Sequence, residues 1–311
     1  MPSAATDWSA TIALKGAGGE PVDLRRTVDG HGLTTLPPMA PDPDQRGFGI
    51  VLRMPRGRPL AVRVREAGKR RVRVTAPAGS PARQRAVVDG VRHVLRLDED
   101  LSGFYEQLLA DQELSWAGTG AGRMMRSQTV FEDVVKTICT TNCAWSGTVR
   151  MVNGLVDGLG DAAVGGGHAF PTPAAMAQAS DEFYADAVRA GYRGPYLRAL
   201  ATAVASGELD LEALAAAPRS ELPDEELEER LLALAGVGPY AAAHIMMLMG
   251  RHSRLILDSW TRPTYAKLRG RKQTDKQILR RFKRYGDHAG LAFWLTLTRG
   301  WVDEGSPVAA G

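Results

Sequence analysis

Two kinds of hydrophobic spacing divide the chain. Between residues 11 and 95 apolar residues tend to alternate with polar ones, as in LAVRVRE and RVRVTAP, and Gly and Pro clusters separate these runs. Alternation with a period of two is typical of strands with one buried face, so we expect an antiparallel β region. From about residue 96 apolar residues recur every three or four positions, which predicts that most of the remaining chain is helical.

This change of spacing predicts an α+β protein. We expect an N-terminal antiparallel β domain over residues 1–95, a mostly α-helical domain over 96–304 and a free tail over 305–311. The segment GDAAVGGGHAF, residues 160–170, is typical of a flexible loop. A chain of 311 residues with 44% hydrophobic residues can bury a sizeable core.

Composition excludes several classes of protein. The N-terminus has no basic leader followed by an apolar core, so we expect no signal peptide. Residues 231–250 carry no formal charge, but Gly236, Gly238 and Pro239 interrupt them, so we expect no membrane span. A net charge of +4 permits a polyanionic partner. Cys139 and Cys143 suit adjacent buried thiols better than a disulfide, which indicates a reducing compartment.

Residues 222–250 predict two helices joined by a tight turn. The first, in LPDEELEERLLALAG, has Asp224 as its N-cap and ends at Gly236, the C′ position. Pro239 then takes the first position of a second helix. The glycines of the turn leave backbone N–H groups uncovered at the start of that helix, where an anion such as phosphate can bind. An ordinary helical hairpin explains the same short pattern.

A longer pattern extends this hairpin. LxxLxGVGxxxAxxxxxxxG is followed, about twenty residues past the turn, by Asp258. This arrangement resembles the helix-hairpin-helix DNA glycosylases of base excision repair, in which the hairpin binds the DNA backbone, often with a monovalent cation, and the aspartate is catalytic. The resemblance implies that Gly236, Val237, Gly238 and Tyr240 form a DNA-binding hairpin and that Asp258 is catalytic.

The chemistry expected of Asp258 can be stated independently. Breaking an N-glycosidic bond develops positive charge on the sugar, and a carboxylate held at low dielectric stabilises that charge and can orient an attacking water. The alternative is an aspartate that only N-caps the helix beginning SWTRPTY; both roles can hold together, because a cap also fixes the direction of the carboxylate.

Two further motifs extend the resemblance to roughly residues 95–304. The segment VFEDVVKTICTTNCAW is similar to the helix of 8-oxoguanine DNA glycosylases in which an asparagine fills the space left by the flipped nucleotide; here that residue is Asn142. GYRGPYLRALA resembles the segment in which a tyrosine wedges into the base stack and an arginine contacts the opposite base. The resemblance implies that Tyr192 is the wedge and Arg193 the opposite-base reader.

The chain also departs from this pattern. Members that cut the DNA strand carry a lysine where Tyr240 stands, and a phenol cannot form the Schiff base of that reaction. The departure implies a monofunctional enzyme that uses water. Cys143 and Ala144 replace further asparagines of the oxoguanine enzymes. No cysteine follows Cys143, so we expect no iron–sulfur cluster and no other metal site.

Aromatic and basic residues suggest how a base and a backbone would be held. Trp145, Tyr240 and Trp260 are candidates for an electron-rich base pocket that favours a cationic alkylated purine, although core packing is the simpler explanation for each. His244 lacks partners at metal-ligand spacing, and we expect it to pack in the core. Residues 262–286 contain ten Lys or Arg residues and one acid, which predicts phosphate contacts.

The sequence therefore predicts a monofunctional DNA glycosylase that flips a damaged purine, alkylated or oxidised, out of duplex DNA and hydrolyses its N-glycosidic bond. We expect double-stranded DNA with a damaged base as partner, no membrane, a monomeric state, a cytoplasmic location that is nucleoid-associated in a bacterium, and no cofactor apart from a monovalent cation at the hairpin. Two alternatives stay open: a non-catalytic helix-hairpin-helix DNA-binding protein, and a bifunctional 8-oxoguanine glycosylase and AP lyase.

Overall fold

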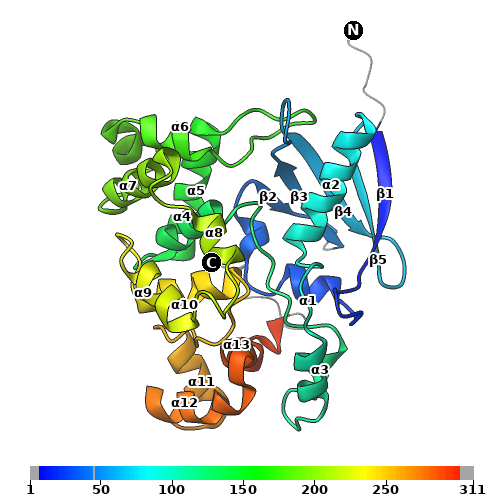
Figure 1. Ribbon diagram of the computed structural model, residues 1–311, viewed down its shortest axis with the longest axis vertical. Coiled ribbons are helices and arrows are strands. Elements are labelled where there is room, and N and C mark those ends of the chain that lie inside the picture. The colour runs from blue at the N-terminus through cyan, green and yellow to red at the C-terminus, as the bar shows by residue number, and fades with distance from the viewer. Residues whose placement is uncertain (1–6, 45, 302–311) are drawn as a thin grey trace.

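An antiparallel sheet is followed by a largely helical region in the computed structural model, which describes residues 7–44 and 46–301 (Figure 1). This arrangement confirms the predicted α+β class. The predicted tail, residues 305–311, lies outside the described residues. The strands are β1 (Asp7–Ala13), β2 (Met39–Pro41), β3 (Gly47–Leu52), β4 (Leu60–Glu66) and β5 (Arg71–Pro77), in the spatial order β1-β5-β4-β3-β2.

The predicted alternation sets the register of the sheet. Val64 of β4 lies opposite Val74 of β5, and both are fully buried while their chain neighbours reach the surface. Helix α2 (Pro81–Val94) covers this buried face (Figure 1). Its Gly90 allows the close approach, because an added Cβ would lie 3.0 Å from Leu52 Cδ1.

Helix α2 corrects the expectation of a β region up to residue 95. Its N-cap, Ser80, accepts a hydrogen bond from Arg83 N, and Pro81 occupies the first turn. The side chains of Val87, Val91 and Val94, spaced four and three apart, face the sheet. Two short helical segments also interrupt the strands, α1 (Leu24–Val28) and η1 (Leu33–Thr35).

The helical region contains two hydrophobic cores that meet at α10 (Pro239–Leu248). Ala242, Ile245 and Met246 belong to one core, and Ala243 and Met247 belong to the other. The remaining helical elements are α3 (Ser102–Leu109), η2 (Ser115–Thr119), α4 (Val130–Thr140), α5 (Trp145–Leu159), α6 (Pro173–Gln178), η3 (Phe183–Ala187), α7 (Arg193–Ser206), α8 (Leu211–Ala216), α9 (Asp224–Leu232), α11 (Thr261–Arg269), α12 (Asp275–Phe282), η4 (Lys283–His288) and α13 (Ala289–Thr298).

The glycine-rich segment 160–170, expected to be a flexible loop, is a hydrogen-bonded turn attached to the sheet. Val164 pairs with Leu60 in a short parallel bridge, and Ala61 N donates to Val164 O over 2.9 Å. Within the turn, Ala163 N donates to Gly167 O over 2.9 Å. Backbone pairing with β4 therefore fixes a segment that composition alone describes as loose.

The uncharged stretch 231–250 is divided between the end of α9, a turn and α10. Among the described residues, no helix has the length and apolar character needed to cross a bilayer.

Candidate active site

The predicted hairpin is formed by α9 and α10, with two differences in detail. Asp224 is the first residue of α9, and Pro223 is the N-cap, so the predicted capping role of Asp224 is wrong. Its carboxylate instead accepts hydrogen bonds from Arg251 Nη1 at 2.7 Å and Ser253 Oγ at 2.6 Å. Helix α9 also ends at Leu232, before the predicted Gly236.

The turn between the two helices depends on glycine at two positions. Gly236 has a φ of 86°, a left-handed conformation that glycine adopts without strain. Gly238 is the N-cap of α10, and an added Cβ there would meet no atom within 4 Å. The side chain of Val237, between them, is buried. The first turn of α10 is therefore uncovered on the side of Gly238, as anion binding to backbone N–H groups requires.

Asp258 stands directly before α11 and is half-buried. Its Oδ1 accepts hydrogen bonds from the backbone N–H groups of Trp260 at 2.8 Å and Thr261 at 2.6 Å, while Thr261 Oγ1 accepts from Asp258 N at 2.8 Å. Within the described residues, Oδ2 has no hydrogen-bond partner. The carboxylate is thus held by the start of α11 through one oxygen and leaves the other available.

Asp258 lines a cavity of about 820 Å³. The cavity lies between the hairpin, the α4–α5 junction, the segment before α11, the C-terminal helix and the η1 region. Its volume lies in the range of pockets that enclose small molecules. The residues that line it include Asn142, Trp145, Tyr240, Asp258 and Trp260, all of which the sequence singled out.

Aromatic rings form much of the cavity wall. The rings of Trp260, Trp294 and Trp301 lie 5.6 to 5.8 Å apart in pairs. The Tyr240 hydroxyl lies 3.1 Å from Thr140 Oγ1, and its ring meets His244 edge-to-face at 6.0 Å. Trp145 is anchored by a 3.2 Å hydrogen bond from its Nε1 to Thr35 Oγ1. Planar apolar surfaces of this kind can stack against an inserted base.

His244 lines the cavity instead of packing only in the core, which corrects the sequence-based expectation. Burial lowers the pKa of His244 to about 4, so the imidazole is neutral near pH 7. Its Nδ1 is buried without a hydrogen-bond partner. The neighbouring His31, whose ring lies 6.3 Å away, has a pKa lowered by burial to about 3. The two histidines therefore add no positive charge to the cavity at neutral pH.

One face of α4 provides polar groups that the sequence gave no reason to select. Lys136 Nζ donates to Glu132 Oε1 over 2.6 Å, and both side chains are 3% exposed. Burial raises the pKa of Asp133 to about 7, although its Oδ1 accepts a 2.9 Å hydrogen bond from Ser127 N. The helical spacing of Asp133, Lys136 and Thr137 is the sequence feature that brings them to one face, but the partner of that face comes from distant segments.

The proposed gap-filling residues lie together beside the cavity. Asn142, with a φ of 48°, donates from Nδ2 to the Tyr192 hydroxyl over 3.3 Å. Tyr192 is 52% exposed and packs against the ring of Tyr196 at 6.1 Å. Arg193 is buried: it donates from Nη2 to Thr141 O, and its guanidinium lies 4.4 Å from the Tyr192 ring. Tyr192 is thus presented outward, whereas Arg193 is engaged with its own chain, and the roles of both stay predictions.

The two cysteines, expected to be adjacent buried thiols, differ in exposure. Cys139 is buried, but Cys143 is exposed, so the expected pair of buried thiols is wrong for the second cysteine. Among the described residues no group of three or more His, Cys, Asp or Glu side chains has an arrangement that could hold a metal ion. The monovalent cation expected at the hairpin stays a prediction.

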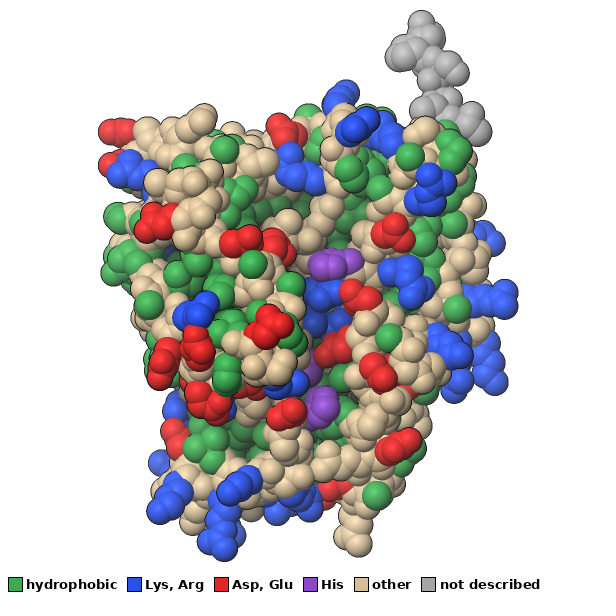
Figure 2. Space-filling model, viewed as in Figure 1, with side chains coloured by type: hydrophobic (Ala, Val, Ile, Leu, Met, Phe, Trp, Pro, Cys, Tyr) green, Lys and Arg blue, Asp and Glu red, His purple; other side chains and the backbone are tan. Residues whose placement is uncertain are grey.

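Charged side chains are distributed unevenly over the surface. Figure 2 shows Asp and Glu side chains over α9, and Lys and Arg side chains at the end of the molecule formed by α11 and α12. The basic run 262–286 is therefore concentrated beyond the C-terminal end of α11, at the opposite end of that helix from Asp258.

Comparisons with known proteins agree on the architecture. No family model and no curated protein matches the chain. Among solved structures, MBOgg1 in complex with a low-affinity DNA ligand matches with a TM-score of 0.73 and 21% identity, covering 94% of this chain and 95% of that one. The 3-methyladenine DNA glycosylase from Archaeoglobus fulgidus matches with a TM-score of 0.72 and 21% identity over 93% and 98% of the two chains. The chain has the fold of the helix-hairpin-helix DNA glycosylases.

A third structure with this fold is the apo form of the 8-oxoguanine glycosylase/lyase from Clostridium acetobutylicum. It matches with a TM-score of 0.67 and 21% identity, covering 93% of this chain and 95% of that one. The matches include the β region as well as the helices, because each covers more than nine-tenths of this chain. The predicted resemblance is confirmed at the level of the fold.

Proposed function

We propose that the protein is a monofunctional DNA glycosylase of base excision repair that extrudes a damaged purine, alkylated or oxidised, into the aromatic cavity and hydrolyses its N-glycosidic bond. The observation that carries the proposal is the placement of Asp258. One carboxylate oxygen is held by two backbone N–H groups at the start of α11, and the other is free at the wall of an aromatic cavity.

The proposed roles follow from this geometry. The uncovered start of α10, at Gly238, binds a backbone phosphate close to the cavity. Tyr192 inserts into the stack, and Asn142, to which it is hydrogen-bonded, occupies the gap left by the extruded nucleotide. The base stacks against Tyr240 and the tryptophans of the cavity wall. Asp258 then stabilises the positive charge on the sugar and orients the water that attacks it.

Electrostatics support an electron-poor purine among these substrates. Neutral His31 and His244 do not repel a cationic base, and Lys136 is neutralised by its ion pair with Glu132. The aromatic faces and the Asp258 carboxylate attract positive charge. These features favour alkylated purines over neutral oxidised ones. The structures of similar fold include glycosylases named for 3-methyladenine and for 8-oxoguanine.

Among the described residues that line the cavity, no amine is available for attack, which supports the monofunctional mechanism. Tyr240 lies at the cavity wall and cannot form a Schiff base. The lysine that lines the cavity, Lys136, is almost fully buried and bound to Glu132. Its deprotonation for attack on the sugar would break that ion pair.

The deciding experiment is excision from duplex oligonucleotides that carry 8-oxoguanine, alkylated purines, hypoxanthine or uracil, analysed with and without hot alkali. We expect strand breaks only after alkali. Asp258→Asn should lower the excision rate by at least about 100-fold, while the amide still caps α11 and DNA binding persists. Asp210→Asn is a matched control, because Asp210 caps α8 by a 2.9 Å hydrogen bond from Ala213 N and lies outside the cavity.

The results separate the alternatives. Excision by the Asp258→Asn protein at the native rate would overturn the mechanism. Binding of damaged DNA without excision of any base would favour a non-catalytic DNA-binding protein. A covalent adduct trapped by borohydride with the native protein would instead establish a glycosylase and lyase.

A further inference from the structure

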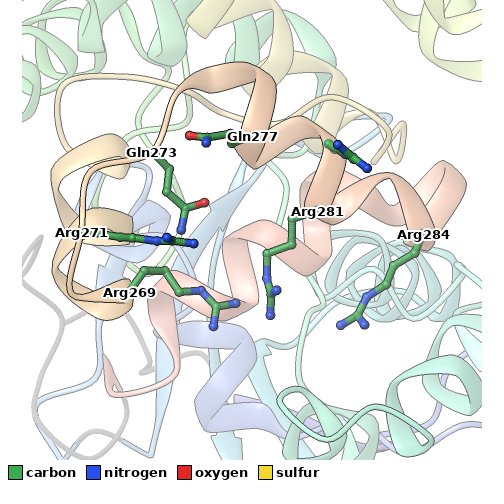
Figure 3. A pocket seen from close by; sticks show the side chains of 7 residues that line it. Arg269, Arg271, Gln273, Gln277, Arg281 and Arg284 are labelled. Carbon is green, nitrogen blue, oxygen red and sulfur yellow. The ribbon is translucent and has the colours of Figure 1, made fainter.

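A second concave site lies at the end of α11 and α12, away from the aromatic cavity. It encloses about 520 Å³, and the described residues that line it are all arginines and glutamines. Figure 3 shows several of these side chains projecting from α11, the following loop, α12 and η4 toward a shared space. The site, which we call the arginine pocket, consists of Arg269, Arg271, Gln273, Gln277, Arg280, Arg281 and Arg284.

Part of this positive charge is balanced by the segment that joins α3 to η2. Arg269 donates to both oxygens of Glu113, at 3.1 and 2.8 Å, and Arg281 donates to the same carboxylate at 2.6 Å. Arg284 donates to Asp111 at 2.6 Å. The hydrogen bond from Arg269 is the main cause that lowers the pKa of Glu113 to about 2, so this carboxylate stays ionised.

The remaining charge is not balanced. Arg271 and Arg280 make no ion pair within the described residues, and both are exposed. Five arginines and two carboxylates give the pocket a net charge of about +3, which is +5 from the guanidinium groups and −2 from Glu113 and Asp111. Like charges held this close repel one another, so a bound anion would lower the electrostatic energy of the pocket.

The donor set favours phosphate oxygens. A guanidinium presents two parallel N–H groups that match a pair of phosphate oxygens, and the amides of Gln273 and Gln277 add neutral donors. Arg269 already uses this geometry with Glu113. The two unpaired arginines are therefore free to contact an anion that enters from solvent.

The position of the pocket indicates where on DNA such a phosphate would lie. Helix α11 begins at Thr261, which hydrogen-bonds to Asp258, and ends at Arg269. At a rise of 1.5 Å per residue the two ends are roughly 12 Å apart along the axis. Measured along a duplex axis, this separation spans roughly three or four nucleotide steps of 3.4 Å, which is farther than the phosphates that flank an extruded nucleotide.

We propose that the arginine pocket is a second phosphate-binding site, which holds a backbone phosphate of the bound DNA several nucleotides from the base in the aromatic cavity. The inference rests on the proposed function for the identity of the ligand as DNA. Under this proposal the basic run 262–286 contacts one particular DNA phosphate and does not act only through a general attraction for polyanions.

The test compares two double variants in binding to undamaged duplex DNA, measured by fluorescence anisotropy over a range of salt concentrations. Arg271→Gln with Arg280→Gln removes the two unpaired guanidiniums of the pocket. Lys276→Gln with Lys283→Gln removes the same charge from α12 and η4 outside the pocket. Thermal unfolding of each variant checks that the fold is retained.

We expect the arginine variant to bind roughly tenfold more weakly at low salt and to lower the slope of log Kobs against log salt by about 1 to 2 in magnitude. The lysine variant should change both by much less. Equal effects of the two variants would show a general charge effect and overturn the proposal, as would unchanged binding by the arginine variant.

Neutral methylphosphonates, placed singly along a duplex that carries a lesion, locate the contact. Native protein should lose affinity when the substitution lies three or four steps from the lesion, and the arginine variant should not. Stabilisation of the native protein by pyrophosphate, lost in the arginine variant while DNA binding stays native, would show a site for a free anion and overturn the proposal. Because the two double variants are compared on undamaged duplex, where there is no base to excise, their outcomes are distinct from a failure of the proposed catalytic function.

Discussion

The buried ion pair between Asp224 and Arg251 allows a quantitative test of how the hairpin is held together. Asp224 opens α9 and Arg251 follows α10, so the pair joins the two helices at the end opposite their turn. The side chains are 8% and 6% exposed. Arg251 also donates to Leu222 O at 3.1 Å, and Ser253 donates to the second carboxylate oxygen at 2.6 Å.

Arg251→Met would leave the Asp224 carboxylate buried with weaker partners. Removing one member of a buried pair costs about 3 to 5 kcal/mol of the free energy of unfolding. Arg219, whose Nε lies 3.3 Å from Asp224 and whose side chain is 40% exposed, retains part of the compensation. We therefore expect a loss of about 3 kcal/mol, measured by urea unfolding near pH 7.

The acid dependence of this loss adds a second check. The hydrogen bonds from Ser253 and Arg251 lower the pKa of Asp224 against the effect of burial. A lowered pKa contributes stability that is present above the ordinary aspartate value and is lost as the pH falls through the folded-state value. The difference between native and Arg251→Met proteins should therefore shrink at acidic pH.

A matched control lies on the same helix. Arg230 donates to Glu226 four residues earlier, with side chains 52% and 46% exposed, and Arg230→Met should cost no more than about 0.5 kcal/mol. A loss below about 1 kcal/mol for Arg251→Met, or one equal to that of the control, would refute the reasoning that this pair holds the hairpin.

Three further variants test other features. Gly236→Ala should lower the free energy of unfolding by about 1 to 2 kcal/mol and weaken DNA binding, because the residue has a positive φ and its Cβ would lie 2.9 Å from Tyr196 Cδ2. Urea unfolding measures the stability and anisotropy the binding, and an unchanged stability would contradict the role given to Gly236 in the turn. Asp133→Asn should stabilise the protein above pH 7 by up to about 4 kcal/mol and have little effect below pH 4. The pKa of Asp133 is raised to about 7, so the native fold loses stability as the pH rises from about 4 to 7. Equal gains in stability at both pH values, measured by urea unfolding, would exclude this cause. Tyr240→Lys should give a covalent adduct with damaged DNA on borohydride treatment, whereas trapping by the native protein would contradict the proposed absence of a Schiff base.

The parts of the site that could be predicted share a local origin. The hairpin, its glycines and Asp258 lie within one continuous stretch, so the order of residues alone indicates a turn, an uncovered helix start and a carboxylate nearby. The strands could be predicted because Val62, Val64, Val72 and Val74 alternate with polar residues. In α2, however, the valines lie four and three apart directly after these strands, and only Ser80 and Pro81 mark the start of a helix.

The remaining cavity residues could not be found in this way. His31, Lys136 and Trp294 come from segments far apart in the sequence, and each resembles an ordinary core residue in its own segment. The low pKa of His31 and the high pKa of Asp133 arise from burial between elements that meet only after folding. The same reason explains Arg193, whose guanidinium is directed to Thr141 by contacts between α7 and α4.

The aromatic cavity lies where three separate hydrophobic cores meet. Leu33 belongs to the core of the sheet, and Trp145 packs against the core around α4. Trp294 belongs to the core of the C-terminal helices, and Trp260 packs against it. Asp258 is positioned by backbone N–H groups of α11 and does not depend on the side chains of the other two cores. Substitutions in one core can therefore reshape one wall while the carboxylate keeps its place. For the proposed glycosylase, such a division would allow substitutions in one wall to change which base is bound while the bond-breaking step stays intact.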